Sequence, residues 1–370
     1  RLTANTGSWA NITEVIEDSN EGAVIYLNGT DYTASGNDKT IYVVSSITIN
    51  GASASDSTLT STFDASRLLQ AFYVAVPTKV TFRNLNIINS ASTSNGGAVY
   101  GTENCNIEFI NCNFINNYAD KANGGAIYID KKGNLKITNC NFTDNEAYNG
   151  NGGAIYGNTE SIIEIYNSIF TYNIADDGGV VYGATGSNIN VYNLYFGDNT
   201  ATNGGAIYGD GNVTVDDSTF EDNDATANGG AIYGNNIIII NSEFTDNTAN
   251  DDGGAVYGIS NLNINNSNFT ENTATNAGGA IVWNNNANIV GSNFINNTAY
   301  VGGAIQGENS PNSKGRVIKS TFTGNSATNT GGAINIENNV NLTVIDSSFT
   351  DNSAPTGGAI NGANTNTIIG

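Results

Sequence analysis

Apolar positions recur along this chain in one short unit that is repeated many times. Each unit opens with a Gly-Gly pair and carries an aliphatic residue three positions after the first glycine, and each of the first ten closes on a phenylalanine. The openers stand 24 to 29 residues apart. They begin at Gly96, Gly124, Gly152, Gly178, Gly204, Gly229, Gly253, Gly278, Gly302, Gly331 and Gly357. The closing residues are Phe114, Phe142, Phe170, Phe196, Phe220, Phe244, Phe269, Phe294, Phe322 and Phe349. Such self-similarity is typical of a solenoid, in which one unit cannot bury its apolar face without neighbours.

The polar and apolar alternation inside each unit predicts three short strands. The first holds the aliphatic residue, the second alternates as in Leu135-Lys136-Ile137, and the third carries the phenylalanine. Abundant Asn, Gly, Thr and β-branched residues disfavour helices. The sequence therefore predicts an all-β chain, a parallel β-helix of about 13 coils with three short strands per coil. Right-handedness follows by analogy with known solenoids.

Residues 1–95 lack the Gly-Gly opener and differ from the repeats. Ser8 can cap a short helix that carries Trp9, Ile12, Val15 and Ile16 on one face. Strand-like runs follow at 23–27, 40–44, 47–50, 72–76 and 80–88. Solenoid ends are atypical because they shield the core from water. We therefore predict an N-terminal cap over residues 1–95, with a capping helix and irregular first coils, and a repetitive β-helix over 96–370.

An asparagine stands three residues after each closing phenylalanine, and an alanine follows two residues later. The asparagines are Asn117, Asn145, Asn173, Asn199, Asn223, Asn247, Asn272, Asn297, Asn325 and Asn352. Amides repeated at strand spacing can donate and accept along the solenoid axis, and asparagine tolerates the bent backbone of a corner. This column favours a structural amide ladder, with ligand-binding amides as the alternative.

Three cysteines occur, Cys105, Cys112 and Cys140. Cys112 and Cys140 take the same slot in adjacent coils, a slot that most other coils fill with serine. Stacked strands bring such positions within disulfide range. The serines favour packed free thiols, and a disulfide is the alternative.

The net negative charge of the chain argues against some classes of binding partner. The 370 residues include 34 acidic and 12 basic side chains, for a net charge of −22. This surface repels phosphate backbones, so we expect no nucleic-acid partner. No apolar run reaches the length of a membrane helix, and we expect no direct membrane insertion.

Two outward columns are candidate binding features. One is an aromatic column of Tyr100, Tyr128, Tyr156, Tyr182, Tyr208, Tyr233 and Tyr257, which ends where Val282 takes the position. It serves either as a contact surface for a glycan or another rod-shaped molecule, or as a ladder that reinforces the sheet. The other is an acidic column of Asp198, Asp222, Asp246 and Glu271. No cofactor is predicted, but Ca²⁺ at this column and a salt-screened edge are both open.

An enzymatic role is the least favoured alternative. A basic group at Lys314, Arg316 and Lys319 has no clear acidic partners, and an active site usually interrupts a repeat. Asn-x-Ser/Thr sequons, which can carry sugar in an exported protein, form a further set of candidates. They begin at Asn11, Asn28, Asn141, Asn212, Asn265, Asn268, Asn296 and Asn341.

The Gly-Gly-Ala-Ile opener with the Phe-x-x-Asn closer resembles the repeat of chlamydial polymorphic outer-membrane proteins. It is also similar to adhesin-like surface proteins of methanogenic archaea, in which Asn-Asn-Thr-Ala and Gly-Gly-Ala-Ile-Tyr are common. The likeness covers residues 96 to about 362. It implies an exported, extracellular β-helix at the cell surface and carries over no catalytic residues.

The predicted function is therefore non-enzymatic adhesion or cell-surface assembly. A self-assembling filament or surface-layer subunit is one alternative, and a polysaccharide-degrading enzyme is another. Expected partners are other copies of the chain, head-to-tail or lateral, or a cell-surface glycan or protein. The last unit begins at Gly357 and reaches Gly370 without its phenylalanine. We expect either a cut inside a longer chain or a docking surface there.

Overall fold

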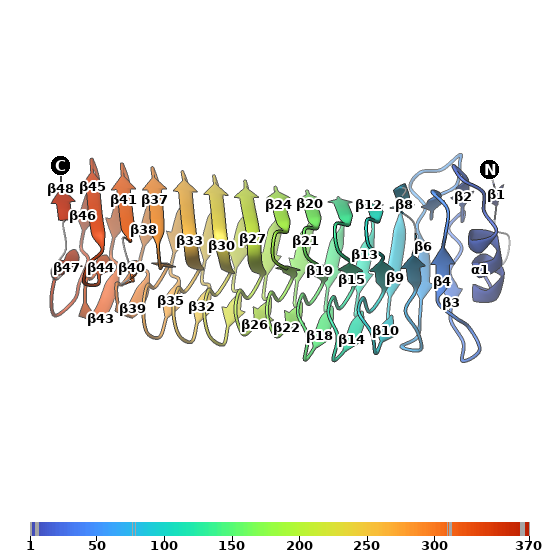
Figure 1. The fold of residues 1–370 in the computed structure, drawn as a ribbon, viewed down its shortest axis with the longest axis horizontal. Coiled ribbons are helices and arrows are strands. Elements are labelled where there is room, and N and C mark those ends of the chain that lie inside the picture. The colour runs from blue at the N-terminus through green and yellow to red at the C-terminus, as the bar shows by residue number, and fades with distance from the viewer. Residues whose placement is uncertain are drawn as a thin grey trace. The chain divides into compact units, whose positions relative to one another are not determined.

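The chain folds as a right-handed parallel β-solenoid of about 13 turns with one short helix near its N-terminus. The computed structural model describes residues 2–3, 7–75, 77, 79–308, 310, 313–362 and 367–369. Gly370, at the predicted open end, and Val76, in one predicted strand, lie outside these residues. The described chain divides into two compact units, residues 1–190 and 191–370. In each unit the strands of successive coils lie side by side (Figure 1).

The helix of the first unit, α1 (Trp9–Glu17), confirms the predicted capping helix. Ser8 is its N-cap, and Trp9, Ile12 and Ile16 are buried while Val15 is half-buried. The Trp9 indole N–H donates to the Lys39 carbonyl at 2.9 Å. The helix therefore covers the core of the first coils with an apolar face fixed at its N-terminal end.

The first unit contains three parallel sheets, and its first sheet consists of two ladders. One ladder runs through β2 (Val24–Tyr26), β5 (Thr48–Asn50), β8 (Lys79–Arg83), β12 (Asn106–Ile110), β16 (Asn134–Thr138) and β20 (Ile162–Tyr166), with β1 (Leu2–Thr3) beside β2. The other runs through β4 (Ile41–Val43), β7 (Phe72–Val74), β11 (Val99–Gly101), β15 (Ile127–Ile129), β19 (Ile155–Gly157) and β23 (Val181–Gly183). The second sheet holds β3 (Tyr32–Thr33), β6 (Ser61–Asp64), β9 (Leu85–Ile88), β13 (Asn113–Ile115), β17 (Asn141–Thr143) and β21 (Ile169–Thr171). The third holds β10 (Ala91–Ser92), β14 (Tyr118–Asp120), β18 (Glu146–Tyr148) and β22 (Ile174–Ala175). Strand β24 (Asn188–Tyr192) contains the boundary between the units.

The second unit repeats this arrangement, and three of its first-sheet strands are longer because the two ladders merge. The first sheet holds β27 (Ile207–Asp216), β30 (Ile232–Ile240), β33 (Val256–Asn265), β36 (Ile281–Trp283), β37 (Asn286–Val290), β40 (Ile305–Gly307), β41 (Lys314–Ile318), β44 (Ile334–Ile336), β45 (Asn341–Ile345), β47 (Ile360–Gly362) and β48 (Thr367–Ile369). The second holds β25 (Tyr195–Gly197), β28 (Thr219–Glu221), β31 (Glu243–Thr245), β34 (Asn268–Thr270), β38 (Asn293–Ile295), β42 (Thr321–Thr323) and β46 (Ser348–Thr350). The third holds β26 (Thr200–Ala201), β29 (Asp224–Ala225), β32 (Thr248–Ala249), β35 (Thr273–Ala274), β39 (Thr298–Val301) and β43 (Ser326–Thr330).

The coils contribute to three sheets, but their strands are distributed differently from the prediction. The first two predicted strands of each unit lie in one sheet, and the third sheet comes from the Asn-x-Ala segment that was predicted as a corner. The run predicted at 80–88 is two strands because Asn84 adopts φ 53° and turns the chain. Pairing continues through the predicted boundary at residue 95, with Phe72 beside Val99 and Val80 beside Ile107. The division into cap and repeats stays a prediction.

The Gly-Gly opener has a backbone explanation. The first glycine of every opener has φ between 61° and 74°, a left-handed conformation that glycine adopts without strain. The second glycine lies against the next coil, and a Cβ built on Gly205 would be 2.1 Å from the Gly230 carbonyl oxygen. Neither position accepts a side chain, so the pair recurs in every regular coil.

Phenylalanine and asparagine columns form the interior of each unit. In the second unit, the rings from Phe196 to Phe349 stack with centroids 4.5 to 5.0 Å apart. The predicted amide ladder is confirmed: within each unit the side-chain Nδ2 of one asparagine donates to Oδ1 of the next at 2.9 to 3.0 Å, as from Asn223 to Asn247 and from Asn117 to Asn145. These buried amides are structural groups in the solenoid.

The cysteines are free and buried, which confirms packed thiols over a disulfide. The Cys112 backbone N–H donates to Cys140 Sγ at 3.3 Å, and the Cys140 N–H donates to Ser168 Oγ at 3.0 Å. Burial raises the pKa of Cys112 well above its ordinary value and that of Cys105 to about 12. Cys140 Sγ thus accepts a hydrogen bond where other coils use a serine hydroxyl, and Cys112 Sγ donates to the Ile110 carbonyl at 3.4 Å.

Candidate functional site

The predicted tyrosines stack into columns on the first sheet. In the first unit, Tyr73, Tyr100, Tyr128, Tyr156 and Tyr182 have ring centroids 5.0 to 5.1 Å apart and planes within 16° of parallel. In the second unit, Tyr208, Tyr233 and Tyr257 stack at 4.9 and 5.2 Å. Tyr128 is buried, and the others are half-buried. Because stacking covers the ring faces, the middle rings present mainly edges and hydroxyl groups to solvent.

The first column begins two coils earlier than the sequence indicated. Tyr42 continues the stack from Tyr73 at 5.1 Å with a 39° tilt between the planes. Both tyrosines lie in coils without the Gly-Gly opener, and only the alternating Ile-Tyr-Val and Phe-Tyr-Val triplets mark them in the sequence. Tyr42 is 47% exposed and, among the residues that the structure describes, stacks on a ring on one side only. It is therefore the tyrosine of this column best placed to offer a ring face to a ligand.

Hydroxyl groups in the middle of the column have protein partners. The Tyr100 hydroxyl donates to Asp130 at 3.0 Å, and Asn158 Nδ2 donates to the Tyr128 hydroxyl at 3.0 Å and to Asp130 at 2.8 Å. Burial first, and then the Asp130 carboxylate, raises the pKa of Tyr100 and Tyr128. Burial raises the pKa of Asp130, but hydrogen bonds from the Lys131 N–H, Asn158 and Tyr100 outweigh it and lower that pKa below its ordinary value. This network favours the sheet-reinforcing role for these two residues.

A groove of about 720 Å³ lies at the exposed end of the tyrosine column in the first unit. We call it the tyrosine groove. Its lining includes Tyr42, Tyr73, Tyr100, Arg67, Leu68, Gln70, Ser92, Ser94, Tyr118 and Asp120. The tyrosines come from the first sheet, whereas Ser92, Tyr118 and Asp120 come from β10 and β14 of the third. The groove is thus formed where two sheets meet beside the turn at 66–70.

The turn at 66–70 gives the tyrosine groove its cation and its exposed apolar group. Ser66 and Arg67 have φ of 53° and 61°, which reverses the chain outside the sheets. Arg67 donates to Asn116 Oδ1, and its guanidinium carbon lies 5.4 Å from the centre of the Tyr118 ring. Leu68 is 55% exposed. The groove therefore combines a fixed guanidinium, apolar surface and aromatic rings.

The acidic column in the second unit has a backbone origin. Asp198, Asp222, Asp246 and Glu271 are exposed and have φ of 54° to 58°, at a corner position that Asn116, Asp144, Tyr172, Asn296, Gly324 and Asp351 fill in other coils. Burial first, and then neighbouring carboxylates, raises the pKa of Asp222 and Asp246. Within the described residues, no group of three or more acidic or thiol side chains is arranged to hold a metal ion. Cation binding at this column stays a prediction.

The second tyrosine column ends at a carboxyl group. The Tyr257 hydroxyl donates to Glu308 Oε2 at 2.9 Å. Burial first, and then nearby carboxylates that include Asp252 and Glu337, raises the pKa of Glu308. Carboxylate-based glycoside cleavage needs a second carboxyl group at a set distance across the substrate. The geometry here gives Glu308 a tyrosine partner, and the enzymatic role stays an untested alternative.

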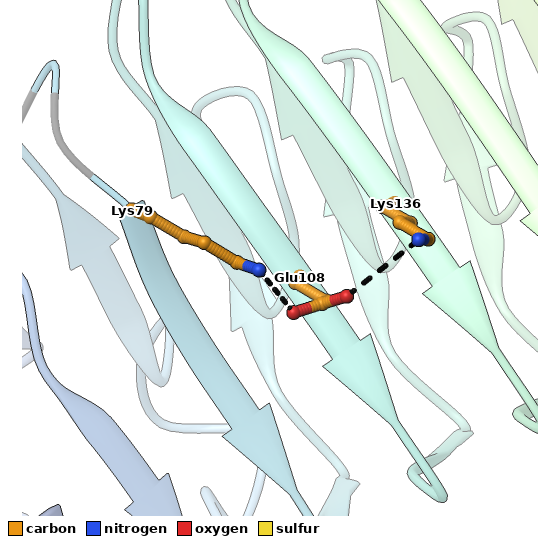
Figure 2. A network of polar contacts seen from close by, with 3 residues as sticks. All are labelled: Lys79, Glu108 and Lys136. Carbon is orange, nitrogen blue, oxygen red and sulfur yellow. Dashed lines mark ion pairs between the residues drawn. The ribbon is translucent and has the colours of Figure 1, made fainter.

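A further charged group lies on the outward face of β8, β12 and β16 and was missed in the sequence. Glu108 Oε2 is 2.6 Å from Lys79 Nζ, and Glu108 Oε1 is 4.0 Å from Lys136 Nζ. Figure 2 shows the two lysines approaching the carboxylate from neighbouring strands. The Glu108 side chain is 10% exposed, so the lysines neutralise a carboxylate that burial would otherwise penalise. Only the strand register, which the sequence does not state, brings these three residues together.

None of the eight sequon asparagines is buried. Those at Asn11, Asn28, Asn141, Asn212 and Asn296 are exposed, and those at Asn265, Asn268 and Asn341 are half-buried. Glycosylation at these positions stays a prediction.

The solved structures that resemble the chain share little sequence identity with it. They include bacteriophage CBA120 tailspike protein 3, with 11% identity over 96% of this chain and 58% of that one and a TM-score of 0.44. The A-module of Azotobacter vinelandii mannuronan C-5 epimerase AlgE4 is 10% identical over 98% of this chain and 100% of its own, with a TM-score of 0.38. The chain thus spans less than two thirds of the tailspike chain. No curated protein matches it in sequence.

Two family models match the repeats directly. Residues 126–295 match the right handed beta helix region, and residues 111–130 and 319–337 match the Chlamydia polymorphic membrane protein repeat. Over the described residues, no helix is long and apolar enough to cross a membrane. The matches support a β-helix of the polymorphic-membrane-protein type, and repeats of this type suggest a surface protein.

Proposed function

We propose that this protein is a non-enzymatic surface adhesin that binds a neutral, extended glycan in the tyrosine groove. The observation that carries the proposal is the groove itself, about 720 Å³ of hollow at the exposed end of an aromatic column. Ligand sites of roughly 300 to 1,000 Å³ with apolar walls and a few polar groups are common in proteins. The resemblance of the repeats to adhesin-like proteins of methanogenic archaea supports the same class.

The lining of the groove suits sugar rings. Tyr42 and Leu68 offer exposed apolar surface against which the C–H face of a pyranose ring can pack. Arg67 and Asp120 supply a charged donor and a charged acceptor for hydroxyl groups, and the side chains of Ser92 and Ser94 lie alongside. These groups lie across two sheets, so an extended ligand contacts more of them than a compact one.

Charge favours a neutral glycan. The groove contains one cation, Arg67, which is already engaged with Asn116 and Tyr118, and one carboxylate, Asp120. The chain as a whole carries a net charge of −22. A polyanionic ligand would meet an unfavourable field on approach.

The test is a screen of the whole chain against an array of neutral and acidic oligosaccharides, followed by calorimetric titration of the ligands it retains. We expect Tyr42→Ala to weaken binding of a neutral oligosaccharide by at least about tenfold. Tyr300 is a matched control because it is 50% exposed and lies in the second unit, outside the groove. Equal binding by Tyr42→Ala and Tyr300→Ala, or retention of acidic oligosaccharides alone, would contradict the proposal.

A further inference from the structure

A second hollow, in the other unit, lies on the outward face of β33, β37 and β41. Its volume is about 230 Å³, and its polar lining is Asn261, Asn263, Asn286, Asn288, Lys314 and Arg316. We call it the basic hollow. At this size, below that of typical sites for drug-sized ligands, it fits a single sugar unit better than a longer segment.

The two cations interrupt columns that amides and hydroxyls occupy in neighbouring coils. Lys314 lies between Asn286 and Asn341 in register. Arg316 lies between Asn288 and Thr343. Asn286 Nδ2 donates to Asn261 Oδ1 at 3.3 Å, so these two asparagines are hydrogen-bonded along the column. The next residue in that column is Lys314.

Neither cation is neutralised by the protein. Within the described residues, Lys314 and Arg316 form no ion pair, whereas Lys79, Lys132 and Lys136 each lie within 4.0 Å of a glutamate. Acidic side chains outnumber basic ones 34 to 12 in this chain, yet no described carboxylate pairs with either of these neighbouring cations. Two adjacent cations that lack carboxylate partners form a local site for an anion. The guanidinium group can bind a carboxylate through two parallel hydrogen bonds.

Asn288, which lines the hollow, has an unused acceptor. Asn288 Oδ1 is buried and has no hydrogen-bond partner among the described residues. A buried carbonyl oxygen without a partner costs about 1 to 3 kcal/mol. A ligand that donates a hydrogen bond here, as a hydroxyl group does, removes that cost. An inorganic oxyanion such as sulfate cannot do so.

We infer that the basic hollow binds a uronic acid unit of a glycan, with its carboxylate at Lys314 and Arg316 and a hydroxyl group at Asn288. Exposed charges act only over about 8 Å at physiological ionic strength, so a single carboxylate in the hollow interacts mainly with the two cations. A polyanion would extend beyond that range over a chain with a net charge of −22, and an isolated anionic unit is therefore favoured. The inference concerns a separate site and does not depend on the tyrosine groove.

The experiment uses the whole chain and titrates it with the methyl glycoside of galacturonic acid, its methyl ester and sodium sulfate, followed by NMR and calorimetry. We expect the acid to bind, the uncharged ester to bind at least about tenfold more weakly, and sulfate to bind more weakly than the acid. Added NaCl weakens binding of the acid because the cations are exposed.

Variants can be chosen that match the neighbouring coils, so folding is not at risk. Arg316→Asn and Lys314→Asn each install the residue that the preceding coil already carries. We expect each to weaken binding of the acid by about tenfold or more, and Asn288→Ala to weaken the acid but not sulfate. Lys319→Asn is the matched control, since it removes a nearby cation that does not line the hollow and its φ of 50° suits asparagine. Equal binding of ester and acid, sulfate binding as tightly as the acid, or equal loss in Lys319→Asn would overturn the inference.

Discussion

The amide ladder supplies the sharpest test of how the solenoid is stabilised, and Asn247→Ala is the change to make. Asn247 is fully buried, and its side chain takes part in four hydrogen bonds. Its Oδ1 accepts from the backbone N–H of Asn223 at 3.1 Å and from the Asn223 amide at 3.0 Å. Its Nδ2 donates to the Phe220 carbonyl at 2.9 Å and to Asn272 Oδ1 at 3.0 Å. Alanine removes all four at once.

The cost can be estimated from these contacts. The Asn223 amide keeps its bonds to the Phe196 and Glu221 carbonyls, and Asn272 Oδ1 keeps the Asn247 backbone N–H. The buried backbone N–H of Asn223, in contrast, loses its acceptor. An unsatisfied buried donor costs about 1 to 3 kcal/mol, and each net hydrogen bond contributes about 0.5 to 1.5 kcal/mol. We expect the free energy of unfolding to fall by about 3 to 5 kcal/mol, similar to a buried Phe→Ala truncation.

Urea denaturation followed by circular dichroism measures this loss, and hydrogen exchange locates it. We expect faster amide exchange at Asn223 in Asn247→Ala, because that N–H no longer has its acceptor. The control is Asn250→Ala, which changes an exposed asparagine of the same coil. If both variants unfold at the same urea concentration and the Asn223 amide stays protected, the ladder contributes nothing and the reasoning is wrong.

Three further changes test other parts of the fold. Gly230→Ala places a Cβ 1.9 Å from the Gly254 carbonyl oxygen, so we expect the free energy of unfolding to fall by more than about 4 kcal/mol and no soluble folded protein to be obtained. A melting temperature equal to that of the wild type would refute this contact. Burial and neighbouring carboxylates raise the pKa of Asp222, so the folded state binds this proton more tightly than the unfolded state and loses stability as pH rises through that pKa. Asp222→Asn should therefore melt higher than wild type at pH 7, with the gap closing in acid, whereas Asp144→Asn, at the same corner position between Asn116 and Tyr172, should show no such gap. Cys112 is buried with a raised pKa, so native protein should resist alkylation as followed by mass spectrometry, and Cys112→Ser should fold normally; rapid labelling would contradict the packing.

The columns of the solenoid could be predicted because each one repeats a single backbone requirement in every coil. The first glycine of an opener needs a left-handed φ, and the second has the next coil at van der Waals contact. The third sheet could not be predicted in the same way. Its strands, such as Thr248–Ala249, are as short as two residues and are defined by hydrogen bonds to the next coil. A stretch that short has no periodicity of its own in the sequence.

The same distinction, between positions that repeat in every coil and positions that do not, applies to the candidate sites. The tyrosine column was predictable because its residues share one slot in consecutive coils. The tyrosine groove was not, because Arg67 and Leu68 belong to a turn in the irregular coils and Ser92 belongs to a short third-sheet strand. Nothing in the sequence fixes how those coils are placed against Tyr42. The approach of Lys79 and Lys136 to Glu108 depends in the same way on a register that only the structure supplies.

Exceptions within a column are informative because the neighbouring coils show what the fold alone requires. Trp283 replaces a glycine, and its ring lies so close to Gly307 and Gly315 that a Cβ on either would be 2.5 Å from it. That exception is compensated by packing, since Trp283 is fully buried in space that two glycines leave open. Arg316 is the opposite case: it is exposed, forms no ion pair within the described residues, and replaces an asparagine or threonine that would serve the sheet equally well. Packing therefore does not account for this arginine, and the anion site inferred above gives it a role.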